Sequence, residues 1–188
     1  MVRPFTVFCP GCAATLVPAA VPRSGEVAAY AYGGALGTAI TSLKYGGRVD
    51  RARPLGELLR RAALGWEGAP PNVVVPVPLH RKRLVERGFN QAALLARPVA
   101  RDLSARFAPL ALERVRDTAA QASLDRPARQ ANVADAFAAR AGAKLAGERV
   151  LIVDDVRTTG ATLDACARAA LAAGASEVRT LVLAAADA

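Results

Sequence analysis

The chain has 188 residues, of which 53% are hydrophobic and 5% aromatic, and its formal net charge is +9. This hydrophobic content excludes a disordered chain, and no apolar run approaches the roughly 20 residues that a membrane-spanning helix needs. The charge favours an anionic partner, although compositional bias toward arginine is the alternative, and the few aromatic side chains argue against extensive base stacking. Because no secretory signal pattern opens the chain, a cytoplasmic location is expected.

The N-terminal segment, residues 1–27, is rich in proline and contains the pair Cys9-x-x-Cys12. This spacing is that of half a zinc site, because a structural zinc ion takes four protein ligands. A second chain could complete the site, and a decayed remnant of a fuller site is the alternative. Cys166 falls in a predicted helix and is expected to be a small buried residue. The main domain is predicted to span residues 28–188.

Three segments in the middle of the chain show the periodicity of regular elements. Residues 54–63 carry leucines at helical spacing after Pro54, which favours a helix. Residues 72–77 form an apolar run that is typical of a buried strand. A second helix is expected over residues 91–106, where Pro98 should kink or split it.

Basic side chains follow the predicted strand directly, over residues 79–90. Ligands of parallel α/β sheets bind at the carboxyl ends of strands, so these side chains are expected near the site. Arginines there, and Arg81 in particular, can hold a pyrophosphate through charge-assisted bonds. His80, the single histidine, can act as an acid or base, but a packed or surface role is the simpler interpretation.

The second half of the chain alternates again between strand and loop patterns. Residues 112–132 are polar, rich in arginine and weakly periodic, which predicts a long mobile loop. Short apolar runs predict strands near 133–138, over 150–153 and over 178–184. Strands that alternate with helices predict a parallel α/β sheet.

The segment from Val150 to Thr162 carries the strongest chemical signal. Apolar residues, two adjacent carboxylates and a turn of small and hydroxyl-bearing residues precede a helical pattern that ends at Gly174. A strand, tight turn and helix in this order bring free N–H groups and the positive end of a helix dipole to one point, which suits a phosphate. Asp154 and Asp155 would repel a phosphate. They are therefore expected to bind ribose hydroxyls, with Mg²⁺ offsetting the negative charge.

This segment resembles the PRPP-binding motif of type I phosphoribosyltransferases. The resemblance implies that Asp154 and Asp155 hold the ribose 2- and 3-hydroxyls. It also implies that the turn holds the 5-phosphate, through Thr158, Thr159, Gly160, Ala161 and Thr162. The alternative is a hydrophobic strand that ends in solvated aspartates before a threonine-rich helix start. A nucleotide-hydrolysing site is disfavoured, because the glycine-rich run at 33–37 lacks the lysine that such a site needs.

Further motifs in the expected order narrow the resemblance to the ComF (ComFC) family, over residues 32–184. The motifs are Leu43-Lys44-Tyr45-Gly46, Pro76-Val77-Pro78-Leu79, Arg87-Gly88-Phe89-Asn90-Gln91, and the separate positions Arg116, Thr118, Gln121, Leu124, Arg126, Arg129, Asn132-Val133 and Ala136-Phe137. The resemblance implies a type I phosphoribosyltransferase fold, an α/β fold with a central parallel sheet flanked by helices. It also implies a short N-terminal hood or a remnant of the zinc-binding segment that ComF proteins often carry.

The resemblance further implies a function. A ComF protein is linked to DNA uptake in natural transformation. Its phosphoribosyltransferase fold implies pentosyl transfer from Mg-PRPP, with the released pyrophosphate held near Lys44, Val77 and Arg81. No residue stands out as a general base. The alternatives are a non-enzymatic PRPP sensor, an adaptor that handles single-stranded DNA, and a nucleobase-salvage phosphoribosyltransferase. A competence helicase and a second copy of the chain are candidate partners.

In phosphoribosyltransferases a flexible loop closes over the site and excludes water. The resemblance gives this role to residues 114–132, whose polar side chains Gln121, Arg126, Arg129 and Asn132 would complete the closure. An ordinary solvated loop is the alternative interpretation.

Overall fold

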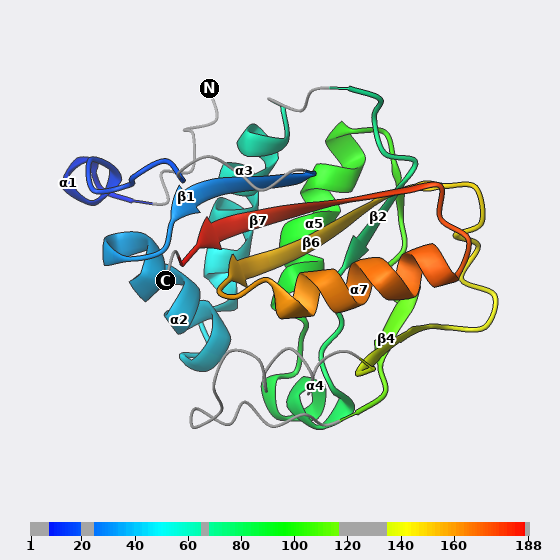
Figure 1. Cartoon of the computed structure of the whole chain (residues 1–188). Helices are drawn as coiled ribbons and strands as arrows, with labels where there is room; N and C mark the ends of the chain where they lie inside the picture. Colours follow the sequence, from blue (N-terminus) through cyan, green and yellow to red (C-terminus); the bar gives the residue numbers. More distant parts are fainter. Residues whose placement is uncertain (1–7, 20–24, 65–67, 117–134, 187–188) are drawn as a thin grey trace.

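The computed structural model describes residues 8–19, 25–64, 68–116 and 135–186. Within them, five strands form a parallel sheet in the order β1-β7-β6-β2-β3, and β4 and β5 form a separate antiparallel pair (Figure 1). The parallel sheet that the alternating pattern predicted is thereby confirmed. The strands are β1 (Glu26–Ala31), β2 (Val73–Pro76), β3 (Arg106–Phe107), β4 (Leu112–Arg114), β5 (Phe137–Ala139), β6 (Arg149–Arg157) and β7 (Glu177–Ala185).

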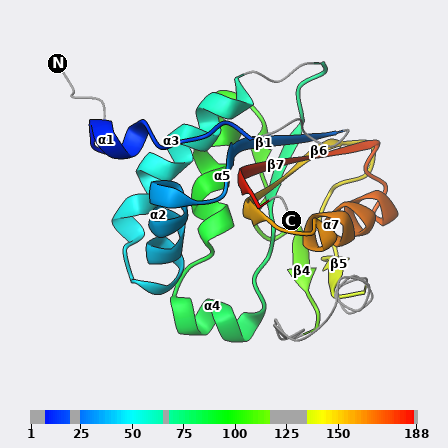
Figure 2. The same ribbon diagram turned by 60° about the vertical axis from the view of Figure 1, so that its left-hand side comes forward.

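Helices cover both faces of the large sheet. In Figures 1 and 2, α3 and α5 lie together on one face and α7 lies on the other. Helix α2 shares a hydrophobic core with α3 and α5. The helices are α1 (Pro10–Ala13), α2 (Gly34–Tyr45), the short 3-10 turn η1 (Val49–Arg51), α3 (Ala52–Ala63), α4 (Arg81–Arg87), α5 (Gln91–Asp102) and α7 (Ala161–Ala172).

Strand β6 supplies both cores from alternate positions. Leu151 and Val153 belong to the core under α2, α3 and α5, whereas Val150 and Ile152 belong to the core under α7. Successive side chains of a strand point to opposite faces, so a strand that is covered on both sides reads as a continuous apolar run. The strand continues past this run to Arg157, so the two aspartates lie on the strand itself.

The predicted second helix differs from the observed one in two ways. Helix α5 ends at Asp102, because residues 106 and 107 form the edge strand β3 beside β2. The helix is also unbroken at Pro98. The ring of Pro98 packs against Gly56 of α3, where an added Cβ would lie only 3.1 Å from Pro98 Cγ. Because Gly56 has no side chain, helix α3 leaves space for the ring of Pro98.

The loop and basic segments also differ from expectation. Residues 112–114, predicted to lie in a loop, pair with β5 as β4, and the strand expected near 133–138 is observed over 137–139. The basic segment after β2 contains α4, a helix of 7 residues. In the part of the chain that the structure describes, none of the helices has the length and apolar character needed to cross a membrane.

Candidate functional site

The two adjacent carboxylates lie near the carboxyl end of β6 and are buried. Asp154 is 9% exposed and Asp155 is 2% exposed. The backbone N–H of Asp155 donates to Oδ1 of Asp154 over 2.8 Å. Asp155 faces α2 and α5, as Val153 does two residues earlier, and the charge of Asp154 acts on Cys166 of α7. The sequence motif thus places two acids at the point where a parallel sheet binds ligands.

Asp155 is held by residues from two helices. Nζ of Lys44, near the end of α2, lies 2.5 Å from Asp155 Oδ2 in an ion pair that lacks regular hydrogen-bond geometry. Nε2 of Gln91, the first residue of α5, donates to Asp155 Oδ1 over 3.5 Å. Arg87 of α4 donates to Oε1 of Gln91, and its guanidinium lies 5.2 Å from the centre of the Tyr45 ring. These five side chains form one network.

The segment before α5 positions Gln91. The side chain of Asn90 caps the helix by accepting from the N–H groups of residues 92 and 93, and it donates to the carbonyl of Val77 over 3.0 Å. Gly88 ends α4 at a φ of 79°, in the left-handed region that glycine adopts without strain. Asn90 thus links the end of β2 to the start of α5, and Gly88 ends α4 just before it. The start of α5 lies next to Asp155.

Burial and charge shift the pKa values of this site. Burial alone would lower the pKa of Lys44, but the charge of Asp155 and the bonding between the two groups outweigh burial, so its pKa is raised. The pKa of Asp154 is raised well above its ordinary value, first by burial and then by the charge of Asp155. Burial, followed by the charge of Asp154, likewise raises the pKa of the Cys166 thiol. The site therefore contains one carboxyl group that resists ionisation.

The shift of Asp154 predicts a pH dependence of stability. Its folded pKa lies above its unfolded pKa, so the folded state loses stability as the pH rises from about 4 toward the folded pKa. An Asp154→Asn variant cannot ionise at this position, so its folded state does not lose this stability as the pH rises. The variant keeps the Oδ1 atom that accepts from the N–H of Asp155. We expect its thermal midpoint to exceed that of the native protein by more at pH 8 than at pH 4.5. Thermal melts at the two pH values measure this, and a pH-independent difference would contradict it.

The turn after β6 leads into α7 as predicted. Gly160 has a φ of 86° and occupies the N-cap position of α7, where it offers no side chain to the first N–H groups of the helix. The Thr159 hydroxyl accepts from Ala161 N over 3.4 Å. Thr158 is exposed, and Thr162 is partly buried in the first turn. This arrangement leaves a helix N-terminus with small side chains beside the two carboxylates, as a phosphate would require.

The three residues expected to hold pyrophosphate have different surroundings. Lys44 lines a cleft of about 420 Å³ next to the ion pair. Val77 is buried, and its N–H donates to the carbonyl of Val153 over 2.9 Å. Arg81 is exposed at the start of α4. The cleft is lined by Lys44, Tyr45, Arg83, Glu86 and Arg87.

Arg83 was expected among the basic residues that can hold a pyrophosphate, whereas Arg87, Tyr45 and Gln91 had no individual role in the expectation. A signal was present, since Arg83 and Arg87 are four residues apart and such residues share one face of a helix. The helix itself was not predicted, so this face was missed. The predicted loop residues Gln121, Arg126, Arg129 and Asn132 lie outside the described part of the chain.

The cysteine pair has the spacing of half a zinc site. Cys12 N donates to Cys9 Sγ over 3.5 Å, and this bonding lowers the pKa of the Cys9 thiol. The hydrogen bond with Cys9, followed by its charge, raises the pKa of Cys12. Within the described ranges, no group of three or more His, Cys, Asp or Glu side chains gathers as a metal site would require. A tetrahedral zinc site is therefore not complete in the described residues of one chain.

Metal analysis tests whether two chains share a zinc ion at these cysteines. Sharing predicts about one-half equivalent of zinc per chain and loss of that zinc in a Cys9→Ser variant. The Cys166→Ser variant is the control, because Cys166 is a buried residue of α7. A zinc content well below one-half equivalent, in protein purified without chelators, would reject the site.

Comparison with known proteins identifies relatives of this chain. Residues 90–188 match the model of the phosphoribosyl transferase domain. DNA utilization protein YhgH of Escherichia coli (strain K12) is 35% identical over 156 residues, which cover 81% of this chain and 68% of that protein. Competence protein F of Haemophilus influenzae is 35% identical over 139 residues, which cover 72% of this chain and 61% of that protein.

A solved structure shows the same fold. The glutamine phosphoribosylpyrophosphate amidotransferase from B. subtilis, complexed with ADP and GMP, superposes with a TM-score of 0.51 at 20% sequence identity. The superposition covers 74% of this chain and 30% of that enzyme. At this identity the likeness concerns the fold alone.

Proposed function

This chain belongs to the phosphoribosyltransferase family and, within it, to the ComF proteins, and from this membership we propose that it binds Mg-PRPP at the end of β6. We further propose that it transfers the phosphoribosyl group to an acceptor and releases pyrophosphate. The observation that carries the proposal is the buried pair Asp154 and Asp155, next to the open N-terminus of α7.

The carboxylates suit the ribose of PRPP. Each ribose hydroxyl can donate to a carboxylate oxygen, and hydrogen bonds to charged groups are worth about 1.5–3 kcal/mol each. Asp155 is already held by Lys44 and Gln91, so its orientation is set before a ligand arrives. Fixed negative charge beside C1 also stabilises the positive charge that develops there as the bond to pyrophosphate breaks.

The cationic cleft suits the leaving group. In the described part of the chain, Lys44, Arg83 and Arg87 line it together with a single acid, Glu86. When the C1–O bond breaks, its electron pair remains on the pyrophosphate oxygen, and the attacking atom of the acceptor forms the new bond to C1. Cationic side chains next to the ribose site would hold the charge that pyrophosphate gains. A basic nitrogen of the acceptor can supply the nucleophile without a general base from the protein.

The donor set fits a hard divalent cation that arrives with the substrate. Carboxylates and phosphate oxygens are the ligands that Mg²⁺ prefers, and two aspartates beside a diphosphate need added positive charge. When bound, Mg²⁺ would neutralise part of the pyrophosphate charge. Lys44 offsets one carboxylate from the protein side.

Titration calorimetry tests the proposal. PRPP is expected to bind in the presence of Mg²⁺ and to bind at least about tenfold more weakly once EDTA removes the metal, because the carboxylates then repel the diphosphate. Ribose 5-phosphate, which lacks the pyrophosphate, is the control ligand and should show a smaller effect of the metal. Absence of PRPP binding under both conditions would overturn the proposal.

The names of the relatives support a role in DNA uptake or utilization. We propose that the protein acts in the cytoplasm on incoming DNA, with a competence helicase and a second copy of the chain as candidate partners. A non-enzymatic PRPP sensor or single-stranded DNA adaptor is favoured by one observation, the net charge of +9. Release of pyrophosphate from PRPP in the presence of nucleobases or single-stranded DNA separates transfer from sensing.

A further inference from the structure

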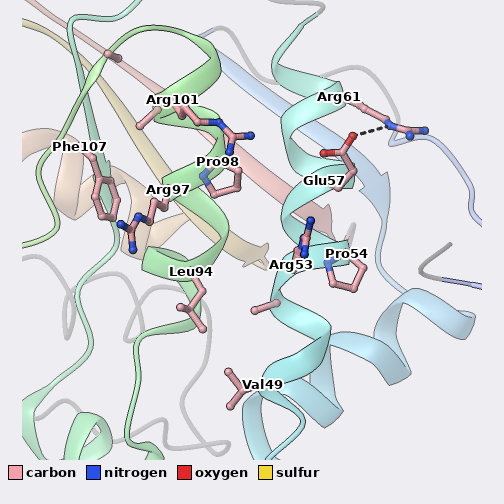
Figure 3. A pocket seen from close by; sticks show the side chains of 13 residues that line it. Val49, Arg53, Pro54, Glu57, Arg61, Leu94, Arg97, Pro98, Arg101 and Phe107 are labelled. Carbon is pink, nitrogen blue, oxygen red and sulfur yellow. Dashed lines mark hydrogen bonds and ion pairs between the residues drawn. The ribbon is translucent and has the colours of Figure 1, made fainter. Parts of the chain in front are cut away.

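A long groove lies between α3 and α5 on the side that faces away from the sheet (Figure 3). Its volume is about 1020 Å³, and its lining residues come from η1, α3, α5 and the segment that leads to β3. It shares no lining residue with the cleft at Lys44. The groove therefore belongs to a different part of the surface from the proposed PRPP site.

The floor of the groove is apolar. Leu94 and Pro98 of α5 and Pro54 of α3 line it, and Phe107 lines it on the side of α5 away from α3 (Figure 3). All four side chains are partly buried. Helices α3 and α5 have 12 residues each, which corresponds to about 18 Å of helix. A groove that runs along these two helices has room for about three turns of an added helix.

Four arginines line this groove among the residues that the structure describes. Arg53 and Arg61 belong to α3, and Arg97 and Arg101 belong to α5. All four side chains are exposed. On each helix the two arginines are separated by four or eight residues, a spacing that places them along one face.

The acidic side chains near the groove are already paired. Glu57, the one acid among the described residues of the lining, binds Arg60 at 2.6 Å and Arg61 at 3.3 Å. Asp102, just beyond Arg101, binds Arg60 at 2.5 Å and Arg101 at 3.3 Å. The groove therefore presents an excess of positive charge around an apolar floor.

We propose that this groove binds an acidic amphipathic helix of a partner protein. The apolar stripe of such a helix would cover Leu94 and Pro98, and glutamates or aspartates on its two flanks would reach the arginines of α3 and α5. Helices bind grooves through anchors at positions i, i+3 or i+4, and i+7, a spacing that matches the length of this floor. Complementary charge on the rim speeds association and selects the partner.

A nucleic acid would match the positive charge of the groove but not its apolar floor. Single strands bind through successive bases stacked on aromatic side chains. Among the described residues that line the groove, Phe107 is the only aromatic one. Prolines, alanines and aliphatic side chains make up the remaining floor, which suits leucine-type anchors better than bases.

The test uses a fluorescein-labelled designed peptide of about 15 residues, with leucines at helical spacing and glutamates on both flanks. Fluorescence anisotropy with the full chain should show saturable binding. Arg97→Glu should weaken it at least about tenfold, because a rim charge changes sign. Arg168→Glu, an equally exposed arginine on α7, is the matched control and should change the affinity less than about twofold. Circular dichroism confirms that both variants are folded.

Two further comparisons decide the outcome. A peptide of the same composition, scrambled so that its leucines no longer share one face, should bind at least about tenfold more weakly. Equal binding of the scrambled peptide, or equal effects of Arg97→Glu and Arg168→Glu, would overturn the proposal. Binding of an oligodeoxythymidylate that depends on Arg97, without peptide binding, would also overturn it in favour of a nucleic-acid surface.

Discussion

An Asp155→Asn variant is expected to bind Mg-PRPP at least about 100-fold more weakly than the native protein. The substitution keeps the size of the side chain and an acceptor for Gln91, but it removes the charge. A charged acceptor of the ribose hydroxyls and of the developing charge at C1 is thereby lost, and hydrogen bonds to charged groups carry about 1.5–3 kcal/mol each. Calorimetric titration with PRPP and Mg²⁺ measures the loss, and pyrophosphate release should fall with it.

Asp164→Asn is the matched control for this experiment. Asp164 lies on the first turn of α7, near the same phosphate turn, but it is exposed. Its substitution should change PRPP affinity less than about threefold, since an exposed charge is well screened. Equal affinity of the Asp155→Asn variant and the native protein would remove Asp155 from the binding site.

A Lys44→Met variant is expected to lose about 2–3 kcal/mol of folding free energy. Removal of one partner of a buried ion pair typically costs about 3–5 kcal/mol, because an uncompensated charge remains. The side chain of Lys44 is 20% exposed, which reduces the expected cost. Urea denaturation at pH 7 measures the change. The variant should also lose pyrophosphate release, because Lys44 lines the cationic cleft.

A double variant separates the two effects of Lys44. Lys44→Met with Asp155→Asn leaves no unpaired charge, so it should recover most of the lost stability without recovering PRPP binding. Arg61→Met, which breaks an exposed pair with Glu57, is the stability control and should cost less than about 1 kcal/mol. If the double variant is no more stable than Lys44→Met, the pair does not account for the loss.

The acidic strand and the phosphate turn were predictable because their signal is local. Residues 150–162 are contiguous, and a strand, turn and helix in that order determine where the carboxylates and free N–H groups lie. The approach of Lys44 to Asp155 was not predictable in the same way. The two residues are far apart in the sequence, and only the packing of α2 beside β6 brings them together.

Two other differences between the predicted and the observed structure could not be derived from the sequence pattern of one segment alone. Pro98 is tolerated within α5 because Gly56, on another helix, leaves room for its ring. The basic segment gave no helical signal because α4 has 7 residues and buries none of them, so no apolar periodicity marks it. Which arginines line the cleft follows from that helix, and this explains why Arg83 lines it with Lys44 while Arg81 does not.

Successive side chains of β6 point to opposite faces of the sheet, so the two acids of the site have different neighbours. Asp155 depends on α2 and α5 for its partners, whereas Asp154 acts on Cys166 of α7. Each acid is thus surrounded by a different hydrophobic core. Substitutions in one core can change the immediate surroundings of one carboxylate, although the charge of Asp155 still acts on Asp154. Residues of two different cores therefore set the environment of the two acids.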